Sequence, residues 1–267
     1  MNGEKTNAEF LTGAVLALLI GGITLTGMIY LPYEYNAMDS ANRFSPPALS
    51  HLMGTDNFGR DVFSRIMAGA KYTLLTALVT VAGSAAAGSA LGSLSGYAGG
   101  IWDEIIMRLM DTLSSFPGIL LALVMVSLMD NSQGTLIIAL LILFIPGFTR
   151  IMRNGMLQYK NRDFVLAARI AGVSNSRIIF VHIFPNLAPS LLSASVLGLS
   201  NAILAESTMS YLGLGIQPPV PSWGRMLSES QAFLINAPWC ALSPGIMIML
   251  TVLAFHYLGE GLKERTL

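Results

Sequence analysis

The stretch that decides the fold is Asp163 to Asn186, DFVLAARIAGVSNSRIIFVHIFPN, a polar segment between two long apolar runs. We call residues 163–186 the hairpin segment. Its pattern predicts a short helix, a turn at Gly172-Val173-Ser174 and a second helix that ends at Pro185. A defined helical hairpin between two membrane spans is typical of a surface offered to a soluble partner.

Individual residues of the hairpin segment support this reading. Asp163 is expected to cap the first helix, Gly172 to adopt the left-handed conformation after it, and Ser174 to cap the second helix. Ala167 and Ala168 keep one side of the first helix thin, so that another surface can approach closely. From the residues alone, a hairpin packed only against its own chain explains the pattern equally well.

The composition indicates a membrane protein. Of the 267 residues, 53% are hydrophobic and 11% are charged, whereas a soluble domain carries about 25% charged residues. The mean hydropathy is +0.62. The net charge is zero, which argues against a nucleic-acid partner. The single cysteine, Cys240, excludes an internal disulfide and a cysteine-based metal cluster.

The apolar residues occur in blocks long enough to cross a bilayer. The blocks predict an all-α polytopic fold with six transmembrane helices at about 10–30, 73–95, 113–129, 135–150, 190–212 and 239–259. The chain then divides into a cytoplasmic N-terminus with the first transmembrane helix at 1–30, an extracytoplasmic loop at 31–71, a core of five further transmembrane helices at 72–260 that contains a cytoplasmic segment at 151–189, and a cytoplasmic tail at 261–267.

Lysine and arginine set the orientation, because they favour the cytoplasmic side. With the N-terminus inside, ten basic residues fall on inner segments and five on outer ones. Both termini are therefore predicted to be cytoplasmic, as is the hairpin segment. The first block is interpreted as an uncleaved anchor, since Lys5 is the only basic residue before it and its apolar run exceeds that of a signal peptide.

Motifs for catalysis or nucleotide binding are missing from the sequence. It has no Gly-x-x-x-x-Gly-Lys-Ser/Thr phosphate loop, no His-Glu-x-x-His and no Gly-x-Ser-x-Gly. His51, His182 and His256 fall in three different parts of the predicted topology and cannot share a metal. We therefore predict no enzyme, no metal site and no cofactor in this chain.

Two features inside the predicted spans have a structural and a functional interpretation. Glu206 lies in the fifth span, where it either faces the bundle interior as a hydrogen-bonded carboxylate or lines a solute path. Ser84, Gly88, Gly92 and Gly96 recur every four residues, which suits close packing either within the chain or against another subunit.

Five groups of motifs, in order, resemble those of bacterial ABC importer permeases, specifically the second permease of dipeptide, oligopeptide and nickel importers. The hairpin segment, with Ala167-Ala168, Gly172 and Pro185-Asn186, is similar to the cytoplasmic EAA loop of these proteins. The resemblance extends over nearly the whole chain from about residue 51. It includes Gly54–Arg65, then Met107-Arg108 with Asp111 and Phe116-Pro117, then Leu204–Glu206 through Tyr211–Gly215 and Pro218–Gly224, and finally Ala237–Trp239 with Leu253–Phe255 and Gly259.

The resemblance implies a type I importer in a bacterial or archaeal cytoplasmic membrane. It implies a second homologous permease in a heterodimer, two ATPase subunits that hold ATP and Mg²⁺, and an extracytoplasmic solute-binding protein. Dipeptides or oligopeptides are the implied solutes, with nickel or a metal–chelator complex as the alternative. A channel or secondary transporter that works without ATP is the alternative of another class, and it predicts uptake without nucleotide.

The resemblance also assigns roles to residues. Coupling to the ATPase is expected at Ala167, Ala168, Arg169, Gly172, Ser174 and Arg177, the translocation path at Glu206, and the extracytoplasmic mouth at Asp56, Arg60 and Asp61. One departure stands out, because Leu166 occupies the position where the family usually has Glu.

Overall fold

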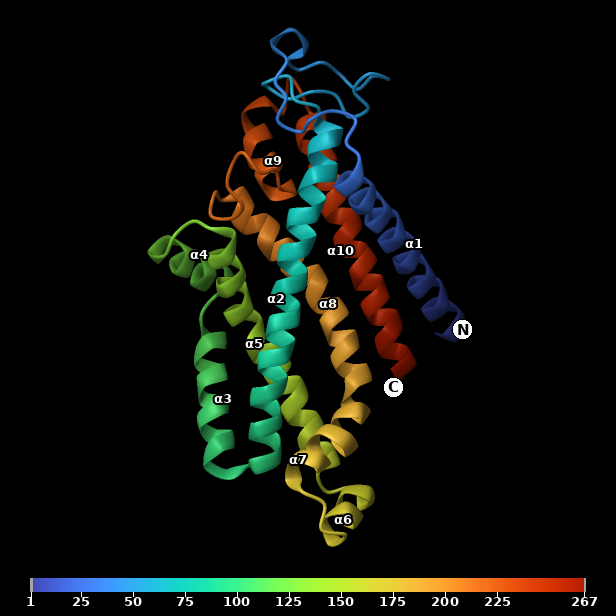
Figure 1. Ribbon diagram of the computed structural model, residues 1–267, viewed down its shortest axis with the longest axis vertical. Helices are drawn as coiled ribbons and strands as arrows, with labels where there is room; N and C mark the ends of the chain where they lie inside the picture. The colour runs from blue at the N-terminus through green and yellow to red at the C-terminus, as the bar shows by residue number, and fades with distance from the viewer. Residues whose placement is uncertain (1, 267) are drawn as a thin grey trace.

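Long helices that run side by side form the molecule, and a loop-rich cap covers one end of the bundle (Figure 1). The computed structural model describes residues 2–266, and within that range it contains helices and no named strand. In chain order the elements are α1 (Asn2–Ile29), η1 (Ser40–Asn42), α2 (Val62–Ala98), α3 (Gly100–Ser115), α4 (Gly118–Leu128), α5 (Gln133–Tyr159), α6 (Asp163–Ile170), α7 (Asn175–Arg177), η2 (Ile178–Ile183), α8 (Phe184–Tyr211), α9 (Trp223–Ser230), η3 (Gln231–Phe233) and α10 (Trp239–Thr266).

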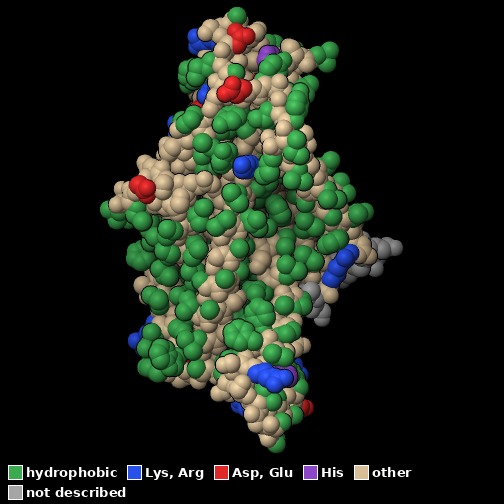
Figure 2. All heavy atoms as spheres, viewed as in Figure 1, with side chains coloured by type: hydrophobic (Ala, Val, Ile, Leu, Met, Phe, Trp, Pro, Cys, Tyr) green, Lys and Arg blue, Asp and Glu red, His purple; other side chains and the backbone are tan. Residues whose placement is uncertain are grey.

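The structure agrees with the predicted number of six spans. Five helices are long and apolar enough to cross a membrane, and the pair α3 and α4 supplies a sixth span if the two are counted together. On the face shown in Figure 2, most charged side chains lie toward the two ends of the molecule, and the broad middle is largely apolar. This distribution suits a protein whose middle contacts lipid.

The helices extend beyond the apolar runs from which the spans were predicted. Helix α2 begins at Val62, inside the loop predicted at 31–71. Helix α5 continues to Tyr159, so the predicted coupling segment at 151–189 begins within a long helix. Helix α10 continues to Thr266 and includes most of the predicted tail at 261–267. Polar residues at a helix end do not interrupt backbone hydrogen bonding, and apolar content alone therefore underestimates helix length.

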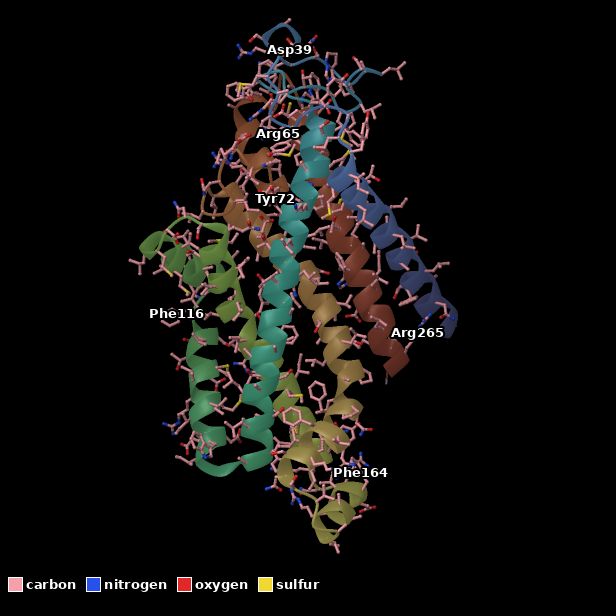
Figure 3. All side chains as sticks on the ribbon, in the orientation of Figure 1. Asp39, Arg65, Tyr72, Phe116, Phe164 and Arg265 are labelled. Atoms are coloured by element: carbon pink, nitrogen blue, oxygen red, sulfur yellow. The ribbon has the colours of Figure 1, made fainter. Side chains whose placement is uncertain are left out.

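The predicted third span, 113–129, is wrong, because the chain bends sharply within it. Helices α3 and α4 meet at an angle of 89°, and Phe116 lies at the bend (Figure 3). Phe116 precedes Pro117 and has an extended backbone with ψ of 140°. Steric conflict with the proline ring disfavours the helical conformation at that position. Helix α4 consequently projects sideways from the bundle (Figure 1).

The small-residue stripe on α2 serves packing within the chain. A side chain added at Gly88, Gly92 or Gly96 would come closer than 3.0 Å to atoms of α5. The Ser84 hydroxyl of α2 donates a hydrogen bond of 3.0 Å to the Leu141 carbonyl of α5. The interpretation as ordinary internal packing is therefore confirmed for this face.

The start of α1 and the end of α10 lie near each other, away from the cap (Figure 1). The side chain of Arg265 on α10 donates to Asn7 of α1 at 2.8 Å, and its guanidinium lies 4.0 Å from the centre of the Phe10 ring. Antiparallel packing of α1 on α10 thus places the two chain ends side by side, as the orientation predicted from the basic residues requires.

Candidate functional site

The hairpin segment forms the tip of the molecule opposite the cap, and Phe164 lies in it (Figure 3). Its first helix, α6, begins at Asp163 after Arg162 at the N-cap position. The predicted capping role of Asp163 is therefore wrong, because this residue is already helical. Its carboxylate instead lies in the first turn, where the helix dipole favours negative charge.

Helix α6 has one face on the bundle and one face free. Val165 is buried, and Ala168 packs with it in an apolar cluster that includes Met152, Met156, Ile178 and Ile183. On the other side Ala167 is exposed, Leu166 is 42% exposed and Ile170 is 89% exposed. The two alanines predicted to form the contact therefore have different roles, since Ala168 anchors the helix and Ala167 faces outward. We call Leu166, Ala167 and Ile170 the apolar ridge.

The turn after α6 has the predicted left-handed glycine. Gly172 has φ of +76°. Its N–H donates to the Arg169 carbonyl at 3.0 Å, and the Val173 N–H donates to the Ala168 carbonyl at 3.0 Å. This hydrogen-bond pair is the Schellman motif, which satisfies the last carbonyls of a helix and fixes the direction of the chain after it.

The second half of the hairpin segment differs from the prediction. Ser174 occupies the N-cap position of α7 as predicted, but its side chain makes no capping hydrogen bond. Helix α7 then passes into a π-helical stretch, Ile178–Ile183, which leads directly into α8. Pro185 does not end a helix, because it lies in the first turn of α8, where a missing N–H costs little.

The end of α2 that is farther from the cap holds the hairpin segment in place. Its Tyr97 hydroxyl donates to Asn175 Oδ1 at 2.7 Å, and the Arg169 guanidinium lies 5.3 Å from the centre of the Tyr97 ring. Arg169 therefore contacts its own chain while it remains exposed, and its role at the rim of a partner contact stays a prediction. Arg177, predicted in the same role, is exposed.

Sequence reasoning missed Tyr97 and Asn175. They are separated by 78 positions, and neither belongs to a motif. The Gly99-Gly100 pair that follows Tyr97 marks the end of α2, but it gives no indication of what the tyrosine contacts.

The outer residues Asp56 and Arg60 form one ionic network in the cap. Arg60 Nε lies 2.6 Å from Asp56 Oδ2, and Arg60 Nη2 lies 3.2 Å from Glu229 of α9. Arg65, which lies near the outer end of α2 (Figure 3), reaches the same Glu229 oxygen at 3.1 Å. The network fastens α9 to the outer end of α2.

Asp61 has a separate role from Asp56 and Arg60. It caps α2 by accepting a hydrogen bond from the Ser64 N–H at 2.7 Å, and His51 Nδ1 lies 2.9 Å from its other oxygen. Arg60 and Asp61 are both buried. In this conformation these side chains shape the cap from within, and a role at an extracytoplasmic mouth stays a prediction.

Glu206 is fully buried on α8. It accepts hydrogen bonds from Ser210 at 2.7 Å and from Ser207 at 3.4 Å. The Ser210 hydroxyl in turn accepts from the Ile216 N–H at 3.2 Å. Glu206 therefore holds the turn that leaves α8, through Ser210, while its assignment to the translocation path stays a prediction.

Comparison with known proteins agrees with this architecture. Residues 88–266 match the family described as binding-protein-dependent transport system inner membrane component. The chain is 38% identical over 261 residues to the dipeptide transport system permease protein DppC of Alkalihalophilus pseudofirmus, which covers 97% of this chain and 86% of the relative. It is 36% identical to DppC of Haemophilus influenzae, over 97% of this chain and 90% of that protein.

Other similar proteins have different names. The glutathione transport system permease protein GsiD of Escherichia coli O157:H7 is 39% identical over 95% of this chain and 84% of that protein. Among solved structures, an inward-facing MetNI methionine ABC transporter matches with a TM-score of 0.62 and 16% identity, over 74% of this chain and 94% of that one. This likeness shows the fold of a type I importer permease. The chain therefore belongs to the binding-protein-dependent transport system inner membrane component family, and it is an ABC importer permease that crosses the bacterial cytoplasmic membrane several times.

Proposed function

We propose that this permease carries dipeptides or short oligopeptides inward, as one half of a heterodimer with a second homologous permease. Two ATPase subunits on the cytoplasmic side bind ATP and Mg²⁺ and supply the energy, and an extracytoplasmic binding protein delivers the solute. The names of the relatives, DppC and GsiD, support peptides as the solute class.

The observation that carries the proposal is the apolar ridge on α6. Ile170 is 89% exposed although it is strongly apolar, and α6 lies beyond the ends of the spanning helices (Figure 1). Its other face is already anchored through Val165 and Ala168. An exposed apolar face on an anchored helix is typical of a protein–protein contact, and in an importer permease the cytoplasmic ATPase is the partner it suits.

Energy reaches the permease through differential binding. An ATPase dimer that closes around ATP favours whichever permease conformation offers it the better contact. The ratio between inward- and outward-facing states then changes by the ratio of the two affinities. The hairpin segment is the element through which such a preference acts, because it projects from the bundle and continues into α8.

Two isoleucines allow a matched test of docking. Ile170→Glu places a charge on the apolar ridge, and we expect the ATPase subunits to dissociate from the purified permease. Ile235→Glu is the control, since Ile235 is 96% exposed but lies between η3 and α10 at the cap end. Retention of the ATPases by both variants contradicts the docking assignment.

The solute is tested on the complete complex in nanodiscs. We expect dipeptide-loaded binding protein to raise ATP hydrolysis and to deliver peptide across the membrane only with ATP present. Glutathione is assayed beside it, because one group of relatives is named for that tripeptide. Uptake without nucleotide contradicts the importer mechanism and favours a channel or secondary transporter.

A further inference from the structure

One side chain, Tyr97, contacts both halves of the hairpin segment, α6 before the Gly172 turn and α7 after it. Its ring lies beneath Arg169 in the last turn of α6, and its hydroxyl donates to Asn175 at the start of α7. These two residues stand on opposite sides of the Gly172 turn. Displacement of either α6 or α7 therefore acts on the Tyr97 side chain at the end of α2.

The end of α2 that carries Tyr97 is fixed to its neighbours. Lys160 Nζ at the end of α5 donates to the Gly96 carbonyl at 2.9 Å. On α5, Arg153 binds Asp103 of α3 through two hydrogen bonds of 2.5 and 2.6 Å, and Ser95 donates to the same carboxylate. Three consecutive residues of α2 thus contact α3, α5 and the hairpin segment.

The direct continuation of the hairpin segment into α8 is less tightly packed. Hollows of about 550, 470 and 210 Å³ adjoin the inner half of α8, and Leu191 lines all three. The hollow of 470 Å³ separates part of this half from α2, and the hollow of 210 Å³ adjoins α5. The inner half of α8 therefore borders three hollows, although Leu187 still packs with Met152 and Met156 of α5.

The hairpin segment therefore has two mechanical connections, the covalent one to α8 and the side-chain one through Tyr97 to α2. We propose that Tyr97 is a positioning residue, which passes displacement of the hairpin segment to α2 and with it to α3 and α5. The proposal rests on the proposed function, because the displacement comes from the ATPase. A tyrosine at a helix end often anchors a protein in the lipid headgroups, but this ring and hydroxyl are directed at the hairpin segment.

The test separates binding from coupling in the complete complex with its ATPases and binding protein. Tyr97→Phe removes the hydroxyl and keeps the ring beneath Arg169, and Asn175→Ala removes the acceptor. For each we expect the ATPases to stay bound, the melting temperature to stay near that of the wild type, and the solute transported per ATP to fall about two- to tenfold, the range of one net hydrogen bond. The double variant is expected to be no worse than either single one, because both remove the same interaction.

Tyr72→Phe is the matched control, because Tyr72 lies on the same helix at its outer part (Figure 3). An unchanged transport-to-ATP ratio in Tyr97→Phe and Asn175→Ala overturns the inference, as do additive losses in the double variant or an equal loss in Tyr72→Phe. Failure of the proposed function looks different, since Ile170→Glu then retains its ATPases.

Discussion

A substitution at Gly172 is the most specific perturbation of the hairpin segment, because the only structural demand on this residue is its positive φ angle. The residue has φ of +76°, and a Cβ atom added to it meets no atom within 4 Å. Substitution therefore causes no clash with neighbours. The cost comes only from placing an L side chain in the left-handed region.

That cost is about 1–2 kcal/mol for an ordinary residue. It corresponds to a shift of about 5–30-fold in the equilibrium between the formed turn and other conformations. Gly172→Val bears the cost fully, because β-branched residues are genuine outliers at positive φ. Gly172→Asn is the matched variant, since Asn visits this region with its short polar side chain.

We expect Gly172→Val to insert into the membrane at the wild-type level, to lose much of its bound ATPase and to lose uptake. Gly172→Asn is expected to retain both. The measurements are retention of ATPase subunits during purification and ATP-dependent uptake into proteoliposomes. Normal uptake by Gly172→Val refutes the reasoning, because the Schellman turn is then dispensable for coupling.

Three further predictions concern packing and buried charge. Gly92→Ala brings a Cβ closer than 3.0 Å to α5 and is expected to destabilise the protein by about 1–3 kcal/mol, measured as a lower melting temperature in detergent. Gly147→Ala is the control, because Gly147 has open space around it, and its melting temperature is expected to stay at the wild-type value. Glu229→Ala leaves three cap arginines without this partner and is expected to cost about 1–3 kcal/mol, whereas Glu104→Ala breaks an exposed pair and costs under about 1 kcal/mol. Glu206→Gln still accepts the hydrogen bond from Ser210 and is expected to retain stability and uptake, while Glu206→Leu loses stability; a stable Gln variant without uptake assigns the carboxylate charge to the solute path.

Local features of the sequence predicted local features of the structure well. Apolar blocks located the spans, and a glycine in a short polar segment predicted the left-handed turn, since both depend on residues close together in the chain. The bend at Phe116-Pro117 also had a local signal, because the residue before proline avoids the helical conformation. That signal was overlooked when residues 113–129 were assigned to one span.

Contacts between distant residues were beyond the reach of sequence patterns. The Tyr97–Asn175 hydrogen bond depends on how α2 and the hairpin segment meet in space, and no periodicity encodes that meeting. Glu229 of α9 binds Arg60 and Arg65 across more than 160 positions, in addition to Arg225 four positions away on its own helix. A single sequence shows these residues as ordinary charges.

The π-helical stretch Ile178–Ile183 allows the hairpin segment to hold one extra residue without a rotation of the apolar ridge about the α8 axis. A π turn holds an extra residue relative to an α turn, and each residue of an α-helix turns the chain by about 100°. An extra residue in a regular helix would swing the apolar ridge around the α8 axis by about that angle, but the π turn absorbs the residue. Deleting one residue between Ser174 and Phe184 is therefore expected to convert the stretch to regular helix and to leave the orientation of the apolar ridge nearly unchanged. The orientation of the apolar ridge relative to α8 therefore tolerates one residue more or less in this stretch, as long as the π turn forms or disappears with it.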